Sequence, residues 1–332
     1  SDGIFETMDE AVNAAEEAQK KLVTMDVSER EKLIAAIRKV ILENAMELAA
    51  LCAKETKMGR VDHKYIKLKL VAEKTPGTEV LKTKAYTGDN GLTLVEMGPY
   101  GVIGAITPST NPAETVACNS IGMIAAGNSV VFSPHPGAVK CSLETIKLIN
   151  KAIKEAGGPD NLITSVTKPS IENTNAMMEH APRWSSAPDL TRLEPVIAGG
   201  AYAPAGNPPV VVDETADIKK AAMDIIKGCS FDNNLPCIAE KEAIIVEKVY
   251  DEFLSELDKN NSVYKLSREE VDKLCGIVLN EKIENGVKKY FINKDYVGKD
   301  AFILLQSIGV NVSKNIDCLI CTVENEHPFV QE

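Results

Sequence analysis

The stretch "GVIGAITPSTNPAETVACNSIGMIAAGNSVVFSPHPGA" at residues 101–138 decides the fold class of this chain. It opens with a short apolar run at 101–107, continues through a helical pattern at 112–127 that a glycine closes, and returns to an apolar run at 129–133. Short apolar runs bounded by turn residues predict buried strands, and their alternation with helices predicts a parallel sheet. We therefore expect a doubly wound α/β domain that binds ligands where its strands end, around 107–111 and 133–137.

The same alternation extends along the chain on both sides of this stretch. Helical patterns at 138–158 and 170–180 flank a strand pattern at 162–166, and an amphipathic segment at 7–22 precedes a second one that begins at Ser28. A further α/β region follows a strand pattern at 209–213, with helices expected near 217–228, 248–259 and 267–280. Ser28 with Glu31, and Ser267 with Glu270, have the spacing of helix capping boxes.

Composition excludes several classes of protein. The 332 residues carry a net charge of −11, and 44% of them are hydrophobic, which is typical of a soluble globular protein of about two domains. No basic stripe is available for nucleic acid, and no apolar run approaches the roughly 20 residues that span a bilayer. We expect a cytoplasmic protein whose eight cysteines, which lack a disulfide spacing, are reduced.

One cysteine stands apart from the others. Cys237 ends the polar loop "FDNNLPC" at 231–237, which fits neither helical nor strand periodicity, so the residues alone leave open whether it is a nucleophile or a small packing residue. Cys318 and Cys321 resemble a metal-binding C-x-x-C pair, but side chains three apart on a strand point to opposite faces, and we expect no metal site. The cysteines in helical patterns are expected to be packing residues; these are Cys52, Cys118, Cys141, Cys229 and Cys275.

Polar residues follow the first two strands of the opening stretch. Asn111, in "TPSTNP", is placed either to cap the next helix or to hold an oxyanion, and the local pattern does not decide between them. His135, in "SPHPGA", is either a ligand contact or a surface residue. No G-x-G-x-x-G follows a strand, so any dinucleotide must be held without the usual glycine fingerprint.

Taken together, these segments resemble the aldehyde dehydrogenase superfamily, and within it the CoA-acylating branch that includes propionaldehyde and acetaldehyde dehydrogenases. The resemblance covers about 6–180 and 205–332 and is carried by "GVIGAITPSTNP", "NSIGMIAAGNSVVFSPHPGA", "GNPPVVVDETADI" and "CSFDNNLPCIAEKE". It implies a Rossmann-like parallel sheet domain that binds NAD without the usual glycine fingerprint, together with a second α/β catalytic domain. We expect the N-terminal helices and NAD-binding domain at 1–220 and the catalytic domain at 221–332.

The resemblance also assigns roles to individual residues. It makes Cys237 the nucleophile that forms a thioester with the substrate, and Asn111 an oxyanion donor. The cofactor-binding residues that it implies are Thr107, Pro108, Ser109, His135, Pro136 and Gly137.

The absence of an acidic residue ahead of the strand at 209–213 indicates which molecule accepts the acyl group. Hydrolytic relatives carry a water-activating glutamate ahead of the strand at 209–213, whereas this chain reads "YAPAGNPPVVV" there. The resemblance therefore implies that coenzyme A takes the acyl group and that the substrate is a small aldehyde. Phosphate or water as the acceptor, and an inactive fragment of the family, are the alternatives. The resemblance further implies a homo-oligomer and a place in the cytoplasm, with a bacterial microcompartment and its shell as a further expectation.

Two parts of the chain depart from the family pattern. The stretch "APRWSSAPDLTRLEPVIAGGAY" at 181–202 stands where a nucleotide loop of the "TGGPG" kind is expected, and we interpret it as a shifted reading frame or a misassigned stretch. Relatives are expected to continue past "HPFVQE" into a glutamate-bearing segment near the nicotinamide ribose and a strand that joins subunits. On this interpretation the catalytic domain is truncated at its C-terminal end and carries unpaired strand edges.

Overall fold

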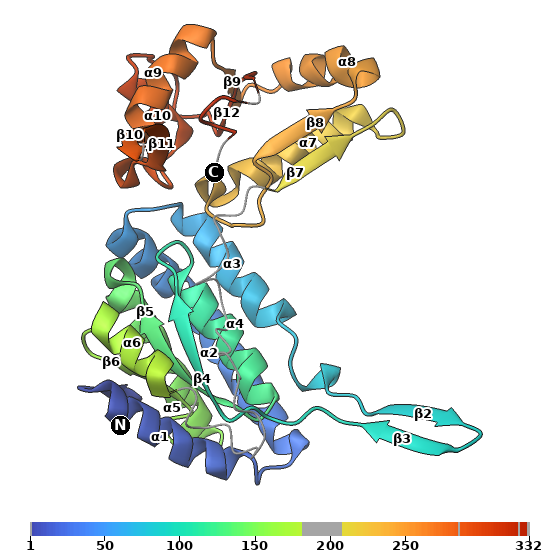
Figure 1. Ribbon diagram of the computed structural model, residues 1–332, viewed down its shortest axis with the longest axis vertical. Helices are drawn as coiled ribbons and strands as arrows, with labels where there is room; N and C mark the ends of the chain where they lie inside the picture. The colour runs from blue at the N-terminus through green and yellow to red at the C-terminus, as the bar shows by residue number, and fades with distance from the viewer. Residues whose placement is uncertain (1, 181–207, 285, 325, 331–332) are drawn as a thin grey trace. The chain divides into compact units, whose positions relative to one another are not determined.

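The computed structural model describes residues 2–180, 208–284, 286–324 and 326–330 (Figure 1). The chain divides into two compact units, which are Ser1–Thr56 with Lys64–Tyr202, and Lys57–His63 with Ala203–Glu332. Each unit is described by itself. The atypical stretch that the sequence shows at 181–204 lies outside the described residues.

The first unit is built on a four-stranded sheet whose strands are all parallel. Their order is β1 (Ile4–Phe5), β6 (Ile163–Val166), β5 (Ser129–Pro134) and β4 (Val102–Thr107). Successive side chains of a strand point to opposite faces, so Val130 and Phe132 join one core cluster while Val131 joins another. The predicted α/β fold with a parallel sheet is confirmed.

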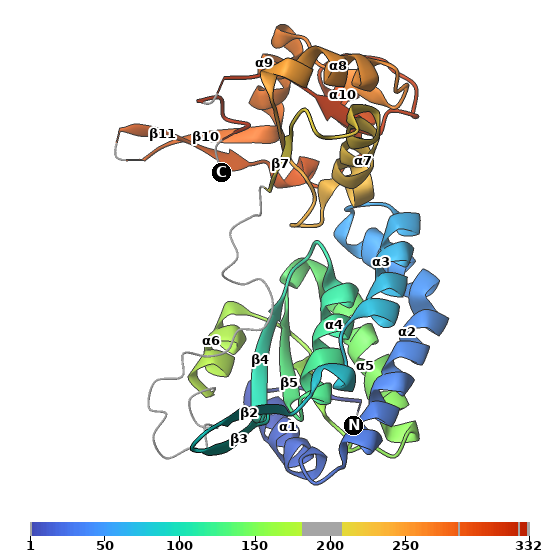
Figure 2. The ribbon, with the colours of Figure 1, turned by 90° about the vertical axis from the view of Figure 1, so that its right-hand side faces the viewer.

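Helices cover both faces of this sheet, as Figure 2 shows. One face is covered by α1 (Met8–Leu22) and α6 (Ile171–His180). The other is covered by α4 (Pro112–Ala125) and α5 (Val139–Glu155), and α2 (Val27–Thr56) packs on these two helices. Cys52 and Cys141 are fully buried in the larger core, as predicted for packing residues.

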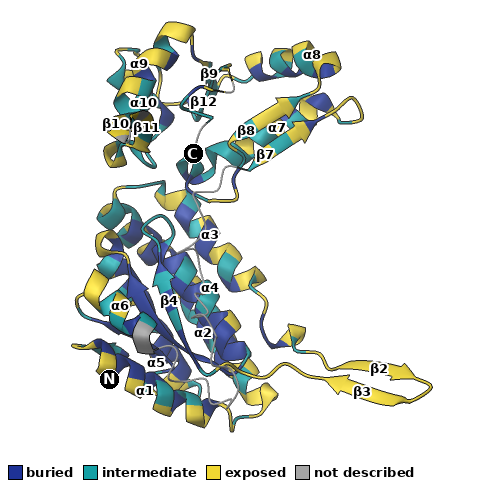
Figure 3. Cartoon of the chain, viewed as in Figure 1, coloured by how far each residue is buried: buried dark blue, intermediate teal, exposed yellow. Residues whose placement is uncertain are grey.

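Three features of the first unit differ from the sequence prediction. The helix α2 begins at Val27, and the Glu29 carboxylate accepts the Asp26 N–H, so the capping box expected at Ser28 and Glu31 is wrong by two residues. The structure also contains a helix, α3 (Val61–Lys74), and a hairpin, β2 (Lys84–Gly88) with β3 (Gly91–Val95), neither of which is among the elements expected from the sequence. The hairpin is exposed along its whole length (Figure 3), so no burial pattern marks it.

The second unit contains short strand pairs and helices. Its parallel pairs are β7 (Pro209–Val212) with β8 (Glu242–Ile245), and β9 (Val263–Lys265) with β12 (Cys318–Ile320). Its antiparallel hairpin is β10 (Leu279–Glu284) with β11 (Val287–Ile292). Its helices are α7 (Ile218–Ser230), α8 (Glu247–Asp258), α9 (Arg268–Val278) and α10 (Ala301–Ser307).

Two core clusters hold this unit together. The helices α7 and α8 supply one, and α9 and α10 supply the other. Cys318 packs in the first cluster and Cys321 in the second, which agrees with the prediction that the pair points in different directions. The predicted capping box of Ser267 and Glu270 begins α9 as expected.

The functional division of the chain stays a prediction, because compactness alone does not test which unit binds a cofactor. The strand β7, which lies before the expected boundary at 220, belongs to the second compact unit. Within the described ranges, no helix combines the length and apolar character needed to cross a bilayer.

Candidate functional site

Cys237 lies at a turn on the surface of the second unit. The Ala239 N–H donates to the Pro236 carbonyl across 3.0 Å, which closes the turn, and the neighbouring Ile238 is 84% exposed. All eight cysteines fall within the described residues, and Cys237 alone among them is exposed. Accessibility is the first requirement for a cysteine nucleophile, and it separates Cys237 from the seven others.

Three of the remaining thiols, Cys275, Cys318 and Cys321, are poorly suited to nucleophilic work. Burial raises the pKa of Cys321 and of Cys275. The Cys229 sulfur lies 3.4 Å from the Cys318 sulfur, and this contact together with burial raises the pKa of Cys318. A raised pKa disfavours the thiolate, which is the reactive form. The contact with Cys318 lowers the pKa of Cys229, so partial burial is what separates that thiol from Cys237.

An unusual backbone run leads into the Cys237 turn. The short 3-10 segment η4 (Phe231–Asn234) contains Asp232, Asn233 and Asn234, with φ angles of 48°, 54° and 61°. This left-handed region costs an ordinary L-residue about 1–2 kcal/mol, and Asp and Asn tolerate it best among residues that have a side chain. The consecutive Asp and Asn residues of "FDNN" therefore permit the tight reversal between α7 and Cys237.

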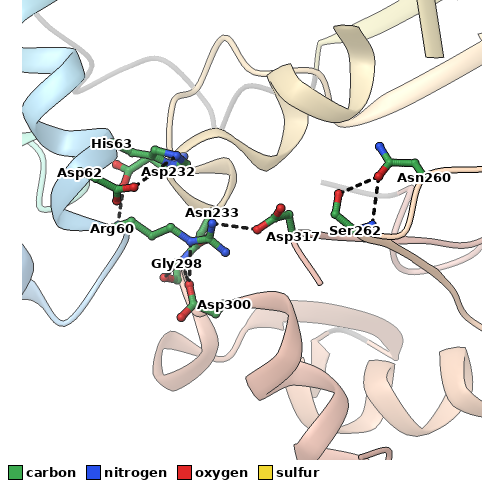
Figure 4. A network of polar contacts seen from close by, with 10 residues as sticks. All are labelled: Arg60, Asp62, His63, Asp232, Asn233, Asn260, Ser262, Gly298, Asp300 and Asp317. Carbon is green, nitrogen blue, oxygen red and sulfur yellow. Dashed lines mark hydrogen bonds and ion pairs between the residues drawn. The ribbon is translucent and has the colours of Figure 1, made fainter. Parts of the chain in front are cut away.

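Side chains of the same run fix it to the rest of the unit (Figure 4). Asp232 is fully buried, and its Oδ1 accepts the Arg60 N–H at 2.8 Å. Asn233 Nδ2 donates to the Gly298 carbonyl and to Asp300 Oδ1, both at 2.9 Å. Asn234 Nδ2 donates to the Cys229 carbonyl at 2.7 Å and to the Glu240 carbonyl at 3.0 Å.

Arg60 ties two distant parts of the unit to this run. Its Nε donates to Asp300 at 3.0 Å and its guanidinium also reaches Asp317 at 2.9 Å. His63 stacks on Phe231 with ring centroids 4.8 Å apart, and its Nδ1 accepts the Asp232 N–H at 2.9 Å. We infer that this network, which the sequence analysis did not find, holds the Cys237 loop in place.

Lys241 closes the loop from the other side. Its Nζ donates to the carbonyls of Pro236 and Ala239, both at 3.3 Å, so the ammonium bridges the turn that contains Cys237. Burial lowers the pKa of Lys241, and the negative charge of a nearby Cys237 thiolate opposes that shift. The arrangement places the Lys241 ammonium against the backbone of the turn that carries Cys237.

In the first unit, the residues after β4 and β5 lie side by side. Thr107 is paired with Pro134 in the sheet, and the His135 N–H donates to the Thr107 carbonyl at 3.1 Å. The two predicted cofactor segments, Thr107 to Ser109 and His135 to Gly137, are therefore brought together at one edge of the sheet. Pro108 and Ser109 are half-buried, whereas His135, Pro136 and Gly137 are exposed.

Two details of this edge suit a polar ligand. The Thr107 hydroxyl is buried and has no hydrogen-bond partner among the described residues. His135 Nδ1 accepts the Gly137 N–H at 3.0 Å, which orients the imidazole at the start of the short segment η2 (Pro136–Ala138).

Asn111 occupies the N-cap position of α4, but its side chain is used elsewhere. In the described part of the chain its Oδ1 accepts from Lys67 Nζ and not from the N–H groups of the first turn of α4. Lys67 Nζ also lies 3.3 Å from Glu114 Oε1, and Lys64 Nζ donates to the Thr110 carbonyl at 3.1 Å. The sequence leaves capping and oxyanion binding open for Asn111; the capping alternative is not the one that the structure adopts.

Both lysines come from α3, which sequence reasoning missed. Lys64 and Lys67 are buried beside Leu68 and Ala72, and charged residues on the buried face obscure the apolar period of this helix. Within the described ranges, no group of three or more His, Cys, Asp or Glu side chains is arranged to hold a metal ion.

Comparison with known proteins gives a consistent result. The family model described as "Aldehyde dehydrogenase family" matches residues 2–183 and 202–305. The gap in this match falls within the stretch that departs from the family pattern in the sequence.

Characterised relatives resemble almost the whole chain. It is 43% identical to the acetaldehyde dehydrogenase (acetylating) of Salmonella typhimurium, over 98% of this chain and 70% of that protein. The structure is similar to that of a propionaldehyde dehydrogenase from the fucose utilisation bacterial microcompartment of Clostridium phytofermentans, with 48% identity, a TM-score of 0.87, and coverage of 99% and 75% of the two chains. It is also similar to Rhodopseudomonas palustris propionaldehyde dehydrogenase with bound CoA and an acylated cysteine, with 49% identity, a TM-score of 0.88, and coverage of 100% and 75%.

Proposed function

The chain belongs to the aldehyde dehydrogenase family, and from this premise we propose that it is a CoA-acylating aldehyde dehydrogenase. It converts a short aldehyde, such as propionaldehyde or acetaldehyde, to the acyl-CoA with NAD. The observation that carries the proposal is the exposed Cys237 at the end of an anchored loop. Relatives whose names specify acetylation, and a similar structure that holds CoA and an acylated cysteine, support the same chemistry.

In the first step, the Cys237 thiolate attacks the aldehyde carbonyl carbon. The C=O π electrons move to oxygen, and the product is a thiohemiacetal alkoxide. We assign stabilisation of this alkoxide to the Asn111 side-chain amide and the Cys237 backbone N–H. Lys241 Nζ donates to the Pro236 and Ala239 carbonyls and so holds the turn from which the thiolate attacks.

In the second step, the alkoxide reforms the carbonyl and hydride leaves the carbon, which produces a thioester on Cys237. NAD, when bound, supplies the acceptor for this hydride. The polar edge after β4 and β5 fits the cofactor, because the buried Thr107 hydroxyl has no partner among the described residues and the His135 segment is exposed. We assign cofactor binding there to Thr107, Pro108, Ser109, His135, Pro136 and Gly137.

In the third step, the thiolate of CoA attacks the thioester and expels the Cys237 thiolate. A thiol acceptor ionises far more readily than water, so it needs less help from a general base. The sequence "YAPAGNPPVVV" at 202–212 carries no acid to activate water, which favours CoA over hydrolysis.

The test is NADH formation from propionaldehyde by the full chain, with and without CoA. We expect turnover that depends on CoA and a propionyl-CoA product. A rate that is the same without CoA would assign water as the acceptor, and a rate that depends on phosphate would assign an acyl phosphate product. An iodoacetamide reaction at Cys237 that neither aldehyde nor NAD slows, without turnover, would identify an inactive relative.

The setting of the enzyme is a separate part of the proposal. The similar protein from Clostridium phytofermentans comes from a bacterial microcompartment, which supports a place for this chain in such a compartment and an association with its shell. A homo-oligomer is proposed as well. Size-exclusion chromatography with light scattering tests the oligomer, and co-purification with shell proteins tests the compartment.

A further inference from the structure

Lys67 on α3 and Glu114 on α4 form a buried ion pair beside Asn111. The Lys67 Nζ lies 3.3 Å from Glu114 Oε1, and the two side chains are 10% and 6% exposed. The same Nζ donates a hydrogen bond to Asn111 Oδ1. Because charges are buried only where specific partners hold them, the fold fixes the position of this ammonium.

The chemistry of the two groups decides how the Asn111 amide is turned. A lysine ammonium carries donors only, whereas a carboxamide has an accepting oxygen at one end and a donating NH₂ at the other. The contact with Lys67 can therefore be made only by Oδ1, and this leaves Nδ2 on the side away from Lys67. With the ends exchanged, two donors would face each other.

The donor end of Asn111 is only lightly engaged by the protein. Nδ2 donates to Thr110 Oγ1 at 3.3 Å, which is longer than a typical hydrogen bond, and its second N–H has no partner in the described part of the chain. Lys64 Nζ holds the Thr110 carbonyl at 3.1 Å, so the backbone beside Asn111 is fixed as well. The amide is thus held by its oxygen and free to donate with its nitrogen.

We propose that Lys67 is a positioning residue that holds Asn111 with its N–H groups available to the substrate oxygen. This rests on the proposed function, in which the Asn111 amide donates to the thiohemiacetal alkoxide. Without Lys67 the amide can rotate and present its oxygen, which repels the negative charge that the donor is meant to stabilise. Glu114 serves the same purpose one step further away, since it pairs with the ammonium that holds Asn111.

Substitution of Lys67 in the full chain tests the proposal. Removing one oxyanion donor lowers kcat about 100- to 1,000-fold. Lys67→Met leaves the Asn111 donor in place but no longer oriented, so we expect a smaller fall in kcat for NADH formation, about 10- to 100-fold, with the KM for CoA unchanged. Lys67→Arg keeps a donor-only group and should retain more activity than Lys67→Met. Lys69→Met, on the same helix at a side chain that is 51% exposed, is the matched control and should turn over at the parent rate.

Two double variants separate positioning from charge compensation. Lys67→Met leaves the buried Glu114 without this partner, so Lys67→Met/Glu114→Gln removes both charges; we expect its rate to stay low. Recovery of the parent rate would show that Lys67 only neutralises Glu114 and would overturn the proposal. In an Asn111→Ala background, Lys67→Met should not lower kcat any further. A second fall in kcat there, as large as in the parent, would also overturn the proposal.

A spectroscopic measurement answers the question without turnover. In the chain labelled with ¹⁵N-asparagine, the Asn111 side-chain resonances are assigned by their loss in Asn111→Ala. We expect two resolved signals from the Asn111 side-chain amide in the parent. In Lys67→Met we expect these signals to be shifted and averaged by exchange between the two orientations of the amide. Unchanged signals would overturn the proposal. An Asn111→Ala variant at the parent rate, or a parent chain without turnover, would count against the proposed function and not against the orientation of the amide.

Discussion

Replacing Asp232 by alanine tests whether the "FDNN" run holds the Cys237 loop. Asp232 is fully buried at a φ of 48°, and its Oδ1 accepts the Arg60 N–H at 2.8 Å. Loss of a hydrogen bond to a charged group costs about 1.5–3 kcal/mol. The left-handed conformation costs alanine about 1–2 kcal/mol. We expect Asp232→Ala to lower the free energy of unfolding of the second unit by about 2.5–5 kcal/mol.

Asp232→Gly is the matched control for the backbone contribution to this loss in the free energy of unfolding. Glycine adopts a positive φ at no steric cost, so it loses the hydrogen bond but not the conformational fit. It should therefore be more stable than Asp232→Ala by about 1 kcal/mol. Urea unfolding followed by circular dichroism measures the stability. The rate of Cys237 alkylation by iodoacetamide reports on the loop, and we expect it to change in both variants.

Two results would refute this reasoning. Equal urea midpoints for Asp232→Ala and Asp232→Gly would mean that the left-handed backbone carries no strain for an ordinary residue. A parent-like midpoint and alkylation rate for Asp232→Ala would mean that the bond to the Arg60 N–H does not anchor the loop.

Three other predictions concern the nucleophile, a close approach and a helix cap. Cys237→Ser should lower the rate of NADH formation at least about 1,000-fold, because the thiolate is lost, and should leave the urea midpoint unchanged, because the side chain is exposed. Cys275→Ser should remain active. A Cys237→Ser variant at the parent rate would contradict the assigned nucleophile. Gly59→Ala should destabilise the chain, because Gly59 has a φ of +72° and an added Cβ would lie 2.2 Å from Asp232 Oδ1. Gly88→Ala should be nearly neutral, because a Cβ added there meets nothing within 4 Å. Similar melting temperatures for the two variants would argue against the close contact. The Ser267 N–H, and then the Tyr264 hydroxyl, lower the pKa of Glu270 from its usual 4.5, so its stabilisation is present above that pH and is lost as the pH falls through the folded-state pKa. Melting temperatures between about pH 6 and about pH 3 should show a smaller acid-dependent loss in Glu270→Gln than in the parent, and parallel curves would contradict the assignment.

Much of the first unit could be predicted from local pattern. Short apolar runs bounded by turn residues mark the buried strands, and apolar residues every three to four positions mark the helices, so the segments from 101 to 180 indicate their own secondary structure. The strict alternation then implies a parallel sheet, and its strand ends imply where Thr107 and His135 meet. Cys237 could be singled out for the opposite reason, since it fits no period, and the structure exposes it.

Other features left no local signal. The helix α3 buries Lys64 and Lys67 on the face where apolar residues are expected, so its period is obscured. The hairpins β2–β3 and β10–β11 are largely exposed or irregular in burial, and the start of α2 depends on Glu29 and not on Glu31.

The sequence by itself determined the α/β class, the family resemblance and the identity of the candidate nucleophile, because each of these is written in short contiguous segments. Only the tertiary structure decided what holds those residues. Arg60 meets Asp300 and Asp317 from 240 and 257 residues away, and Lys67 meets Asn111 from 44 residues away. Such contacts satisfy charges and polar groups that folding brings out of water, and their partners are chosen by proximity in the folded chain, which no local period records.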